Sequence, residues 1–317
     1  MNWEAVQRRV SLKRLTTLKA GGEAEYFAQA RSSAQLIETA SAFQKEGIKV
    51  TPLGWGSNFL ASDQGVNGLI LLNQTREITI QGDEVIADSG AAFQDLWLKT
   101  TQSGLVGLEF AVGIPGTVGG ALVSNAGAYR SNISEFLIAL EIVQDGKAEW
   151  VDPSWMEFKY RDSVLRCENP RSALIARTRF RLPKGDAKKS YDEAREYQRQ
   201  RIGKQPPSAS AGSFFKNVID SKLANDIDGL TEGMRKNSVV PAGFLIEQCG
   251  LKGFRIGGAM IGKKHANFLL NVAGANATEL RSLAHYAKAQ VQSKFGVELE
   301  EEVMYIGDWS SFAPIIP

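Results

Sequence analysis

A glycine-rich stretch of seventeen residues, 113–129, constrains the fold more than any other part of this 317-residue chain. Five of its residues are glycine and none is charged. Glycine adopts positive φ at little steric cost and lets a ligand approach bare backbone. Successive free N–H groups in such a loop form an anion-binding nest. The stretch therefore predicts a main-chain site for a large, phosphate-bearing ligand; a tightly packed turn between core elements is the alternative.

A second glycine-rich loop lies upstream, at residues 53–58. Apolar periodicity predicts the elements around it: a strand at 24–28, a helix at 33–46, a strand at 48–52 and a strand at 68–72. The loop differs from the dinucleotide fingerprint, in which Gly-x-Gly-x-x-Gly opens a helix, and no Gly-Lys-Ser/Thr of a P-loop follows. Together with residues 113–129, it predicts one cofactor held by two loops.

The rest of the chain mixes strands and helices, which is typical of an α+β fold. The expected elements are a hairpin of 78–80 with 84–87, a helix at 91–103, a hairpin of 138–143 with 148–151, a strand at 174–182, a solvated helix at 191–201, a helix at 276–295 and a strand at 297–306. Asn276 and Glu279 resemble a capping box. The polar stretch 183–210 is the best candidate for a domain boundary.

Composition excludes several classes of protein. The net charge of +2 gives no bias toward nucleic acid. The first residues lack the apolar core of a signal peptide, and no apolar run reaches the roughly 18 residues of a membrane span. Two cysteines are too few for a disulfide framework, so a reducing cytoplasm is the expected setting. Two histidines and two cysteines without ligand-like spacing predict no metal site.

Six motifs, in this order, resemble those of the UDP-N-acetylenolpyruvoylglucosamine reductase (MurB) family. They are Thr16-Thr17-Leu18-Lys19-Ala20-Gly21-Gly22, the two glycine loops, Tyr160-Arg161-Asp162-Ser163, Ala211-Gly212-Ser213-Phe214-Phe215-Lys216-Asn217 and Leu299-Glu300-Glu301-Glu302-Val303. The segments 249–259 and 264–268 fit the same family. The resemblance runs from about residue 12 to residue 307, nearly the whole chain.

The resemblance implies a fold, a cofactor and a reaction. The fold is a PCMH-type (vanillyl-alcohol-oxidase-like) FAD-binding domain of two α+β subdomains, here 1–73 and 74–188, followed by a C-terminal α/β substrate domain at 189–317. NADPH reduces the flavin, which passes a hydride to C3 of the enolpyruvyl group. A serine protonates C2, and UDP-N-acetylglucosamine enolpyruvate becomes the peptidoglycan precursor UDP-N-acetylmuramate. Localisation in the cytoplasm and no membrane, nucleic-acid or protein partner are expected.

The cofactor-binding residues are expected in the two glycine loops. They are Gly54, Gly56, Ser57, Asn58, Gly113, Ile114, Pro115, Gly116, Thr117, Gly119, Gly120, Ser124, Asn125 and Gly127. Neither loop contains His or Cys, so non-covalent FAD is expected. The same observation disfavours a second hypothesis, a carbohydrate oxidase of this fold with covalently attached flavin.

Three residues are the catalytic candidates. Arg161 is suited to bind the substrate carboxylate bidentately and to stabilise the enolate that hydride addition creates. Ser213 is the proton donor to C2, and Glu302 supports the charge or a proton relay. Each has an ordinary alternative: a surface ion pair, a turn residue and a member of a solvated acidic run. Their joint presence argues against a third hypothesis, a paralogue that binds nucleotide without turnover.

The choice of Glu302 over Glu301 rests on the resemblance, because strand alternation does not separate them. Asn217 and Lys264 are expected to bind substrate, whereas His265 is as well explained by ordinary hydrogen bonding. The chain departs from the family where Val218 replaces a common proline and where about twenty additional residues, 219–239, follow. The short connection between residues 180 and 208 is typical of the shorter-loop subclass and leaves open which group covers the substrate.

Overall fold

The computed structural model describes residues 6–167 and 169–316. The chain forms two compact units. The first comprises residues up to Val10, Ala24–Gly56 and Val66–Gly203; the second comprises Ser11–Glu23, Ser57–Gly65 and the residues from Lys204 onward. Two short N-terminal segments thus fold with the C-terminal part of the chain. The expected boundaries at residues 73 and 188 stay predictions.

The first unit contains a four-stranded sheet in the order β1-β2-β5-β3. Its strands are β1 (Gln7–Ser11), β2 (Glu23–Ala30), β5 (Val66–Asn73) and β3 (Val50–Leu53). β5 pairs in parallel with both β2 and β3. Helix α1 (Ser33–Lys45) connects β2 to β3, which lie on opposite sides of β5, because parallel strands need a long crossover. Leu36, Ala40 and Phe43 of α1 are buried, so the predicted helical stripe is confirmed.

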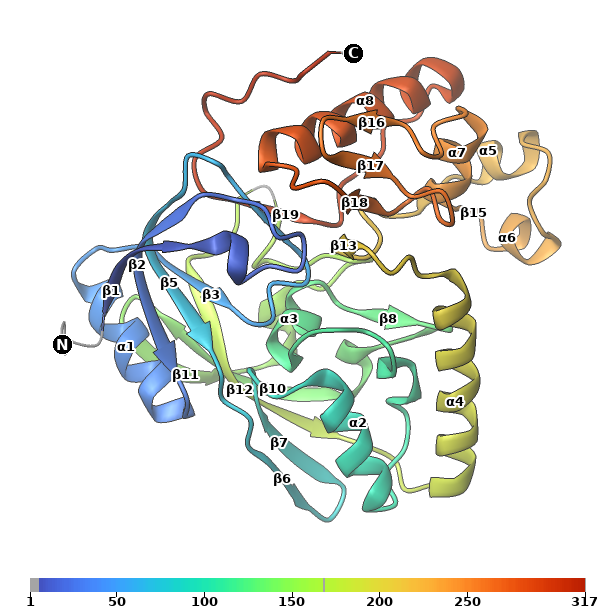
Figure 1. The fold of residues 1–317 in the computed structure, drawn as a ribbon. Helices are drawn as coiled ribbons and strands as arrows, with labels where there is room; N and C mark the ends of the chain where they lie inside the picture. The colour runs from blue at the N-terminus through green and yellow to red at the C-terminus, as the bar shows by residue number, and fades with distance from the viewer. Residues whose placement is uncertain (1–5, 168, 317) are drawn as a thin grey trace. The chain divides into compact units, whose positions relative to one another are not determined.

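A five-stranded antiparallel sheet in the order β11-β10-β12-β7-β6 forms the larger part of this unit (Figure 1). Its strands are β6 (Ile78–Gln81), β7 (Glu84–Asp88), β10 (Leu137–Gln144), β11 (Lys147–Val151) and β12 (Ala173–Arg181). Both predicted hairpins are confirmed by their pairing registers. Helix α2 (Phe93–Gln102) buries Phe93, Leu96 and Trp97, as its periodicity predicts.

Shorter elements complete the first unit. They are α3 (Val118–Val123), the strand pair β8 (Gly127–Ala128) and β9 (Ser131–Asn132), and 3-10 turns at Glu109–Ala111, Ile133–Phe136 and Pro153–Met156. Helix α4 (Ala187–Lys204) is longer than the predicted solvated helix. It is not solvated on every side, because Tyr191 packs edge-on against Trp97 with ring centroids 5.5 Å apart.

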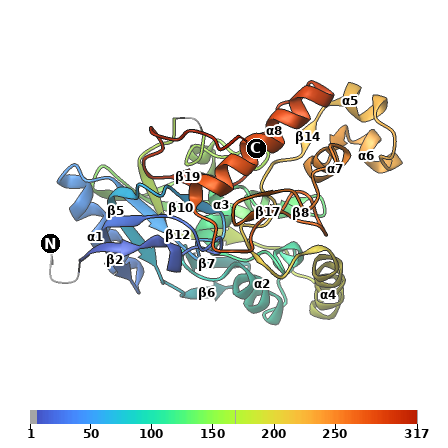
Figure 2. The same ribbon diagram turned by 45° about the horizontal axis from the view of Figure 1, so that its top comes forward.

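The second unit is built on a sheet in the order β13-β18-β17-β16 and on helix α8. Figure 2 labels this helix and strand β17, which it contacts. The strands are β13 (Ala209–Ser210), β16 (Arg255–Ile256), β17 (Ala259–Ile261) and β18 (Leu269–Asn271). α8 (Ala277–Phe295) carries a fully buried stripe of Leu280, Leu283, Ala284, Ala287 and Val291. The predicted capping box of Asn276 and Glu279 is present, and Gly296 ends the helix with φ of 68°.

The predicted strand at 297–306 is wrong over most of its length. Only β19 (Met304–Ile306) is a strand, and it pairs in parallel with β4 (Phe59–Ala61). The residues before it are bonded instead to the Ser213 segment, through a single antiparallel bridge between Phe215 and Glu301. Alternation alone predicted a continuous strand, but a strand needs a continuous partner.

The additional residues 219–239 form a small excursion of their own. It contains α5 (Ser221–Asp226), α6 (Glu232–Lys236) and the short antiparallel pair β14 (Val218–Ile219) and β15 (Val239–Val240). A 3-10 turn at Leu12–Arg14 and helix α7 (Ala242–Gln248) are the remaining elements. None of the helices in the described ranges is both long and apolar enough to span a membrane.

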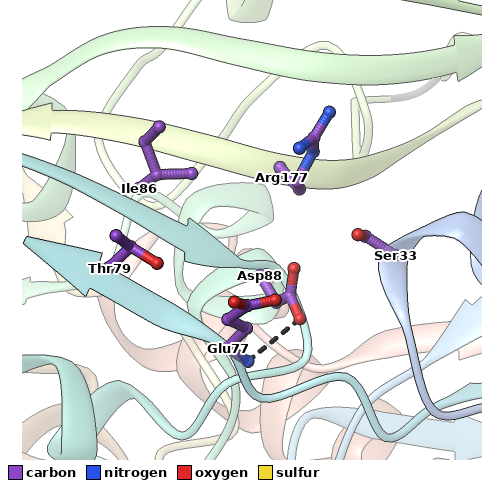
Figure 3. Close-up of a pocket in the computed structure, with 6 residues that line it drawn as sticks. All are labelled: Ser33, Glu77, Thr79, Ile86, Asp88 and Arg177. Atoms are coloured by element: carbon purple, nitrogen blue, oxygen red, sulfur yellow. Dashed lines mark hydrogen bonds between the residues drawn. The ribbon is translucent and has the colours of Figure 1, made fainter.

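A small cavity beside the five-stranded sheet holds two acidic side chains (Figure 3). Asp88 is 5% exposed, and its Oδ2 accepts a hydrogen bond from the backbone N–H of Glu77 at 3.0 Å. Burial, with the nearby Glu77 charge, raises the pKa of Asp88 although that hydrogen bond acts to lower it. The ionised carboxylate is therefore disfavoured in the folded protein.

We expect Asp88→Asn to increase stability at pH 7. A carboxyl whose folded pKa is raised costs stability above that pKa, and this cost disappears as the pH falls toward the unfolded value of 3.8. Asparagine keeps an oxygen for the Glu77 N–H and removes the charge. Urea unfolding at several pH values should show a gain at pH 7 that vanishes near pH 4. Asp83→Asn, at the exposed hairpin turn, is the control; a loss of stability in Asp88→Asn at pH 7 would contradict the argument.

Candidate active site

The two glycine loops contact each other directly within the first unit. Thr117 caps helix α3, and its Oγ1 accepts a hydrogen bond from the N–H of Gly120 at 3.2 Å. A Cβ on Gly54 would lie 2.7 Å from this Oγ1 and 2.9 Å from Cγ2 of Thr117. A side chain at residue 54 would therefore require the side chain of Thr117 to shift. The loops are thus adjacent, and the expectation that they hold one cofactor stays a prediction.

The donors that the 113–129 loop offers to a ligand are at its start. The N–H groups of Val118 and Gly119 donate to Ala91 O at 2.9 Å and to Ser89 O at 2.7 Å. Within the described ranges, the N–H groups of Gly113, Gly116 and Thr117 have no hydrogen-bond partner. Gly113 and Gly116 also have φ of 78° and 139°, which L side chains rarely adopt. These three donors form the part of the loop that is able to bind an anion.

Arg161 lies beside the far end of the same loop. Its Nη1 donates to Asn125 O at 3.1 Å, and its Nη2 donates to Gly127 O. Arg161 and Asn125 both have left-handed backbone, with φ of 52° and 42°. The candidate carboxylate-binding side chain is therefore oriented by carbonyl groups of the glycine-rich loop. No sequence pattern indicated this link between two of the motifs.

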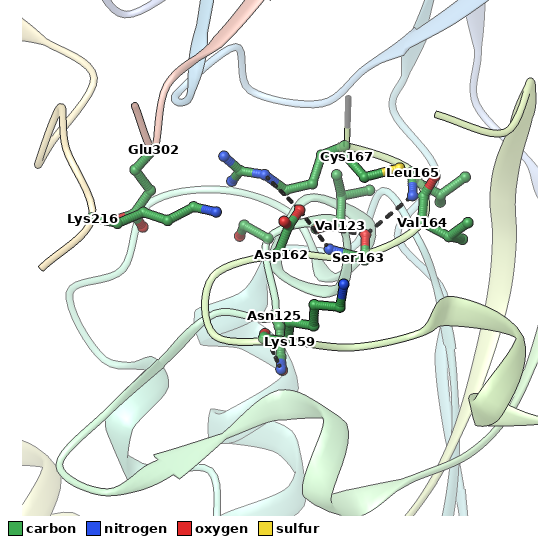
Figure 4. A network of polar contacts seen from close by, with 12 residues as sticks. Val123, Asn125, Lys159, Asp162, Ser163, Val164, Leu165, Cys167, Lys216 and Glu302 are labelled. Atoms are coloured by element: carbon green, nitrogen blue, oxygen red, sulfur yellow. Dashed lines mark hydrogen bonds and ion pairs between the residues drawn. The ribbon is translucent and has the colours of Figure 1, made fainter. Parts of the chain in front are cut away.

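A polar network fixes the turn that carries Arg161 (Figure 4). Ser163 Oγ donates to Val123 O at 2.7 Å, at the end of helix α3. Asn125 Nδ2 donates to Lys159 O at 3.0 Å, so the loop and the turn are joined on both sides of Arg161. Each bond gives a hydrogen-bond partner to polar groups that have lost contact with water on folding.

Ser213 and Glu302 lie on adjoining segments of the second unit. The N–H of Glu302 donates to Phe214 O at 2.7 Å. The carbonyl of Glu302 accepts a hydrogen bond from Asn58 Nδ2 at 2.9 Å, and Asn58 is the last residue of the glycine-rich loop at 53–58. One residue thus joins the Ser213 segment to part of a predicted cofactor loop. A Cβ on Gly212, which has φ of 76°, would meet no atom within 4 Å, so the space next to Ser213 is open.

Asn267 holds the Ser213 segment and was given no role by the sequence. Its Oδ1 accepts from the N–H of Phe215 and its Nδ2 donates to Phe215 O, both at 2.9 Å. Its carbonyl accepts from the N–H of Phe214 at 2.7 Å. The side chain is 3% exposed, so these bonds are well protected from water. The only available signal was its place in the 264–268 segment that fits the family.

The three consecutive glutamates have different partners. Glu300 pairs with the buried Lys216, and Glu301 Oε2 lies 2.9 Å from Nζ of Lys288 on helix α8. These ion pairs account for the first two carboxylates in the run. The assignment of the catalytic role to Glu302 stays a prediction. Its principal competitor, Glu301, has a structural role in the ion pair with Lys288.

The two predicted substrate-binding residues differ in their surroundings. Asn217 Oδ1 accepts from the N–H of Ala242 at 3.3 Å, at the start of helix α7. Lys264 is exposed. His265 Nδ1 accepts from the N–H of Asn267 at 3.2 Å, in line with the ordinary hydrogen-bonding alternative.

Within residues 6–167 and 169–316, no three His, Cys, Asp or Glu side chains are grouped so that they would hold a metal ion.

Comparisons with known proteins agree with this architecture. A family model described as an FAD binding domain matches residues 24–152, which contain both glycine loops. The model for the UDP-N-acetylenolpyruvoylglucosamine reductase C-terminal domain matches residues 204–306. The chain is thus an FAD-dependent oxidoreductase with an FAD-binding domain and a C-terminal domain, as the expected fold class states.

Whole-chain relatives carry the same description. A UDP-N-acetylenolpyruvoylglucosamine reductase of Caldicellulosiruptor bescii is 38% identical over 96% of this chain and 92% of its own length. One from Lactobacillus delbrueckii subsp. bulgaricus is 35% identical over 96% of each. The crystal structure of this reductase (MurB) from Thermus caldophilus superposes with a TM-score of 0.74 and 30% identity over 95% of this chain and 98% of that one. The chain belongs to the UDP-N-acetylenolpyruvoylglucosamine reductase family.

We expect Gly119→Asp to lose flavin, and Gly120→Ala to keep it. A Cβ on Gly119 would lie 2.9 Å from Cβ and 3.1 Å from O of Ser89, so any side chain there displaces the start of α3. A carboxylate also adds charge of the same sign as a phosphate. A Cβ on Gly120 meets only Thr117 Oγ1, at 3.4 Å. The flavin-to-protein absorbance ratio after purification measures both; full occupancy in Gly119→Asp would place the cofactor elsewhere.

Proposed function

We propose that this protein uses NADPH and FAD to reduce UDP-N-acetylglucosamine enolpyruvate to UDP-N-acetylmuramate, a precursor of peptidoglycan. Family membership supports the substrate, because the relatives' names state it. The observation that carries the proposal to particular residues is the position of Glu302. Its backbone is bonded to the Ser213 segment on one side and to Asn58 of a glycine loop on the other.

The two glycine loops are proposed to hold the FAD without a covalent bond. One observation supports the fit: within the described ranges, the N–H groups of Gly113, Gly116 and Thr117 have no hydrogen-bond partner. Donors of this kind suit a pyrophosphate. FAD, when bound, supplies the hydride.

The remaining chemistry is assigned to side chains of this chain. Hydride addition at C3 leaves negative charge at C2 and on the adjacent carboxylate of the substrate. Arg161, whose guanidinium is already oriented by two carbonyls, is proposed to bind that carboxylate and stabilise the enolate. Ser213 donates its proton to C2, and Glu302 supports the proton transfer. A serine hydroxyl is a weak acid, but the enolate is a strong enough base to take its proton.

Asn217 and Lys264 are proposed to bind the substrate. Lys264 is exposed and carries a positive charge suited to a phosphate of the sugar nucleotide. Asn217 has one hydrogen bond from its Oδ1 and also carries an amide nitrogen with two N–H donors.

Ser213→Ala should separate the two half-reactions. If Ser213 only protonates C2, NADPH should reduce the bound flavin at the wild-type rate. Reoxidation by the enolpyruvyl substrate should slow by roughly 10²–10⁴-fold, the range for a missing general acid. Anaerobic stopped-flow absorbance measures both steps, with Ser210→Ala in β13 as the matched control. Normal reoxidation would remove Ser213 from proton transfer, and equal slowing of both steps would indicate a structural role.

Acid treatment should release all the flavin. The two loops contain neither His nor Cys, so no side chain in them is available for the usual covalent links. After precipitation with acid, the yellow colour and its absorbance should be recovered in the supernatant. Colour retained by the washed pellet would refute non-covalent binding.

A further inference from the structure

Arg201, near the end of helix α4, is the most closely engaged side chain that the proposed function does not use. Its Nη1 donates to the carbonyl of Val112, the residue before the glycine-rich loop. Its Cδ lies 3.1 Å from the point that a Cβ on Gly113 would occupy. Its Cζ lies 5.7 Å from the ring centroid of Tyr129, the last residue of the 113–129 stretch. Arg201 therefore contacts both ends of this stretch.

In the described part of the chain, no carboxylate forms an ion pair with Arg201. Among the residues that the structure describes, its partners are the Val112 carbonyl and the Tyr129 ring, and it forms no ion pair. Burial lowers the pKa of Arg201, yet a guanidinium remains charged at neutral pH. A partly desolvated charge without a counterion costs stability. An anionic ligand, which is expected at this loop, would offset the cost by balancing the charge of Arg201.

A second contact joins α4 to the loop four residues earlier, on the same face of the helix. The rings of Tyr197 and Tyr129 are stacked, with centroids 3.6 Å apart and planes 5° from parallel. The hydroxyl of Tyr129 donates to Tyr197 O at 3.4 Å. Tyr129 has φ of 53°, a strained conformation that needs surrounding support. The helix thus holds the loop through two consecutive turns.

We propose that Arg201 is a positioning residue for the glycine-rich loop. By fixing the carbonyl of Val112 and packing against Gly113, it keeps the N–H groups of Gly113 and Gly116, which have no partner among the described residues, in place for a phosphate-bearing ligand. Arg161 holds the later part of the same loop by donating hydrogen bonds to the carbonyls of Asn125 and Gly127. This inference rests on the proposed function of the loop as an FAD site. It assigns Arg201 to cofactor retention and not to hydride or proton transfer.

The test is the affinity of the apoprotein for FAD, measured by quenching of flavin fluorescence. Arg201→Met keeps the length of the side chain but removes its donors and charge. Its dissociation constant should rise by about 10- to 100-fold, the range for a lost hydrogen bond from a charged group. At saturating FAD, the rate of flavin reduction by NADPH should equal that of the wild type. Wild-type affinity in Arg201→Met, or a slower reduction step at full occupancy, would overturn the proposal.

Arg199 provides the matched control on the same helix. Its side chain is 72% exposed and lies 4.0 Å from Glu196, so Arg199→Met should leave FAD affinity unchanged. If Arg201→Met fails to fold, Arg201→Lys and Arg201→Gln replace it. Each keeps one donor nitrogen and neither reproduces the planar fork of the guanidinium, so both should bind FAD less tightly than the wild type. Wild-type affinity in both would overturn the proposal.

Gly113→Ala distinguishes the failure of this inference from that of the proposed function. Alanine is strained at φ of 78°, and its Cβ would contact Arg201. If Gly113→Ala loses FAD but Arg201→Met does not, the loop binds the cofactor and Arg201 does not position it. If both variants bind FAD as the wild type does, the loop is not the cofactor site and the proposed function loses its assignment of residues as well.

Discussion

The backbone of Glu302 is the link on which the arrangement of the second unit depends. Its N–H donates a hydrogen bond to the carbonyl of Phe214, and its carbonyl accepts one from Nδ2 of Asn58, a residue 244 positions earlier in the chain. Parallel pairing of β4 with β19 continues this connection, with Met304 donating to the carbonyl of Asn58 at 3.0 Å. Two segments distant in sequence are thereby held at fixed separations from the Ser213 motif. Glu302 takes part in both of its bonds through its main chain, so neither bond uses its side chain.

The glycine-rich loop shows that one residue type serves two purposes. Gly54 and Gly119 are glycines because their neighbours Thr117 and Ser89 leave no room for a Cβ. Gly113 and Gly116 are glycines because their backbone adopts φ that other residues avoid, and their N–H groups remain without partners among the described residues. Packing therefore explains Gly54 of one loop and Gly119 of the other, whereas Gly113 and Gly116 meet a conformational requirement and have donors suited to a ligand.

Local patterns predicted local structure well. Helices α1 and α8 bury the expected residues, and both hairpins pair as expected, because an apolar stripe or a turn dipeptide carries its own signal. The strand expected at 297–306 was wrong because pairing depends on a partner elsewhere in the chain. The solvation of α4 was misjudged for the same reason. Its polar residues gave no sign that Tyr191, Tyr197 and Arg201 contact Trp97, Tyr129 and Val112.

By itself, the sequence determined the family, the α+β class, the FAD-binding domain and the motifs that carry the candidate chemistry. These follow from ordered motifs and from periodicity, which are properties of neighbouring residues. Only the tertiary structure decided that Glu301 pairs with Lys288, that Asn267 holds the Ser213 segment, and that guanidinium groups hold both ends of the glycine-rich loop. Each of these is a contact between distant residues, and which donor reaches which acceptor is fixed only when the chain has packed.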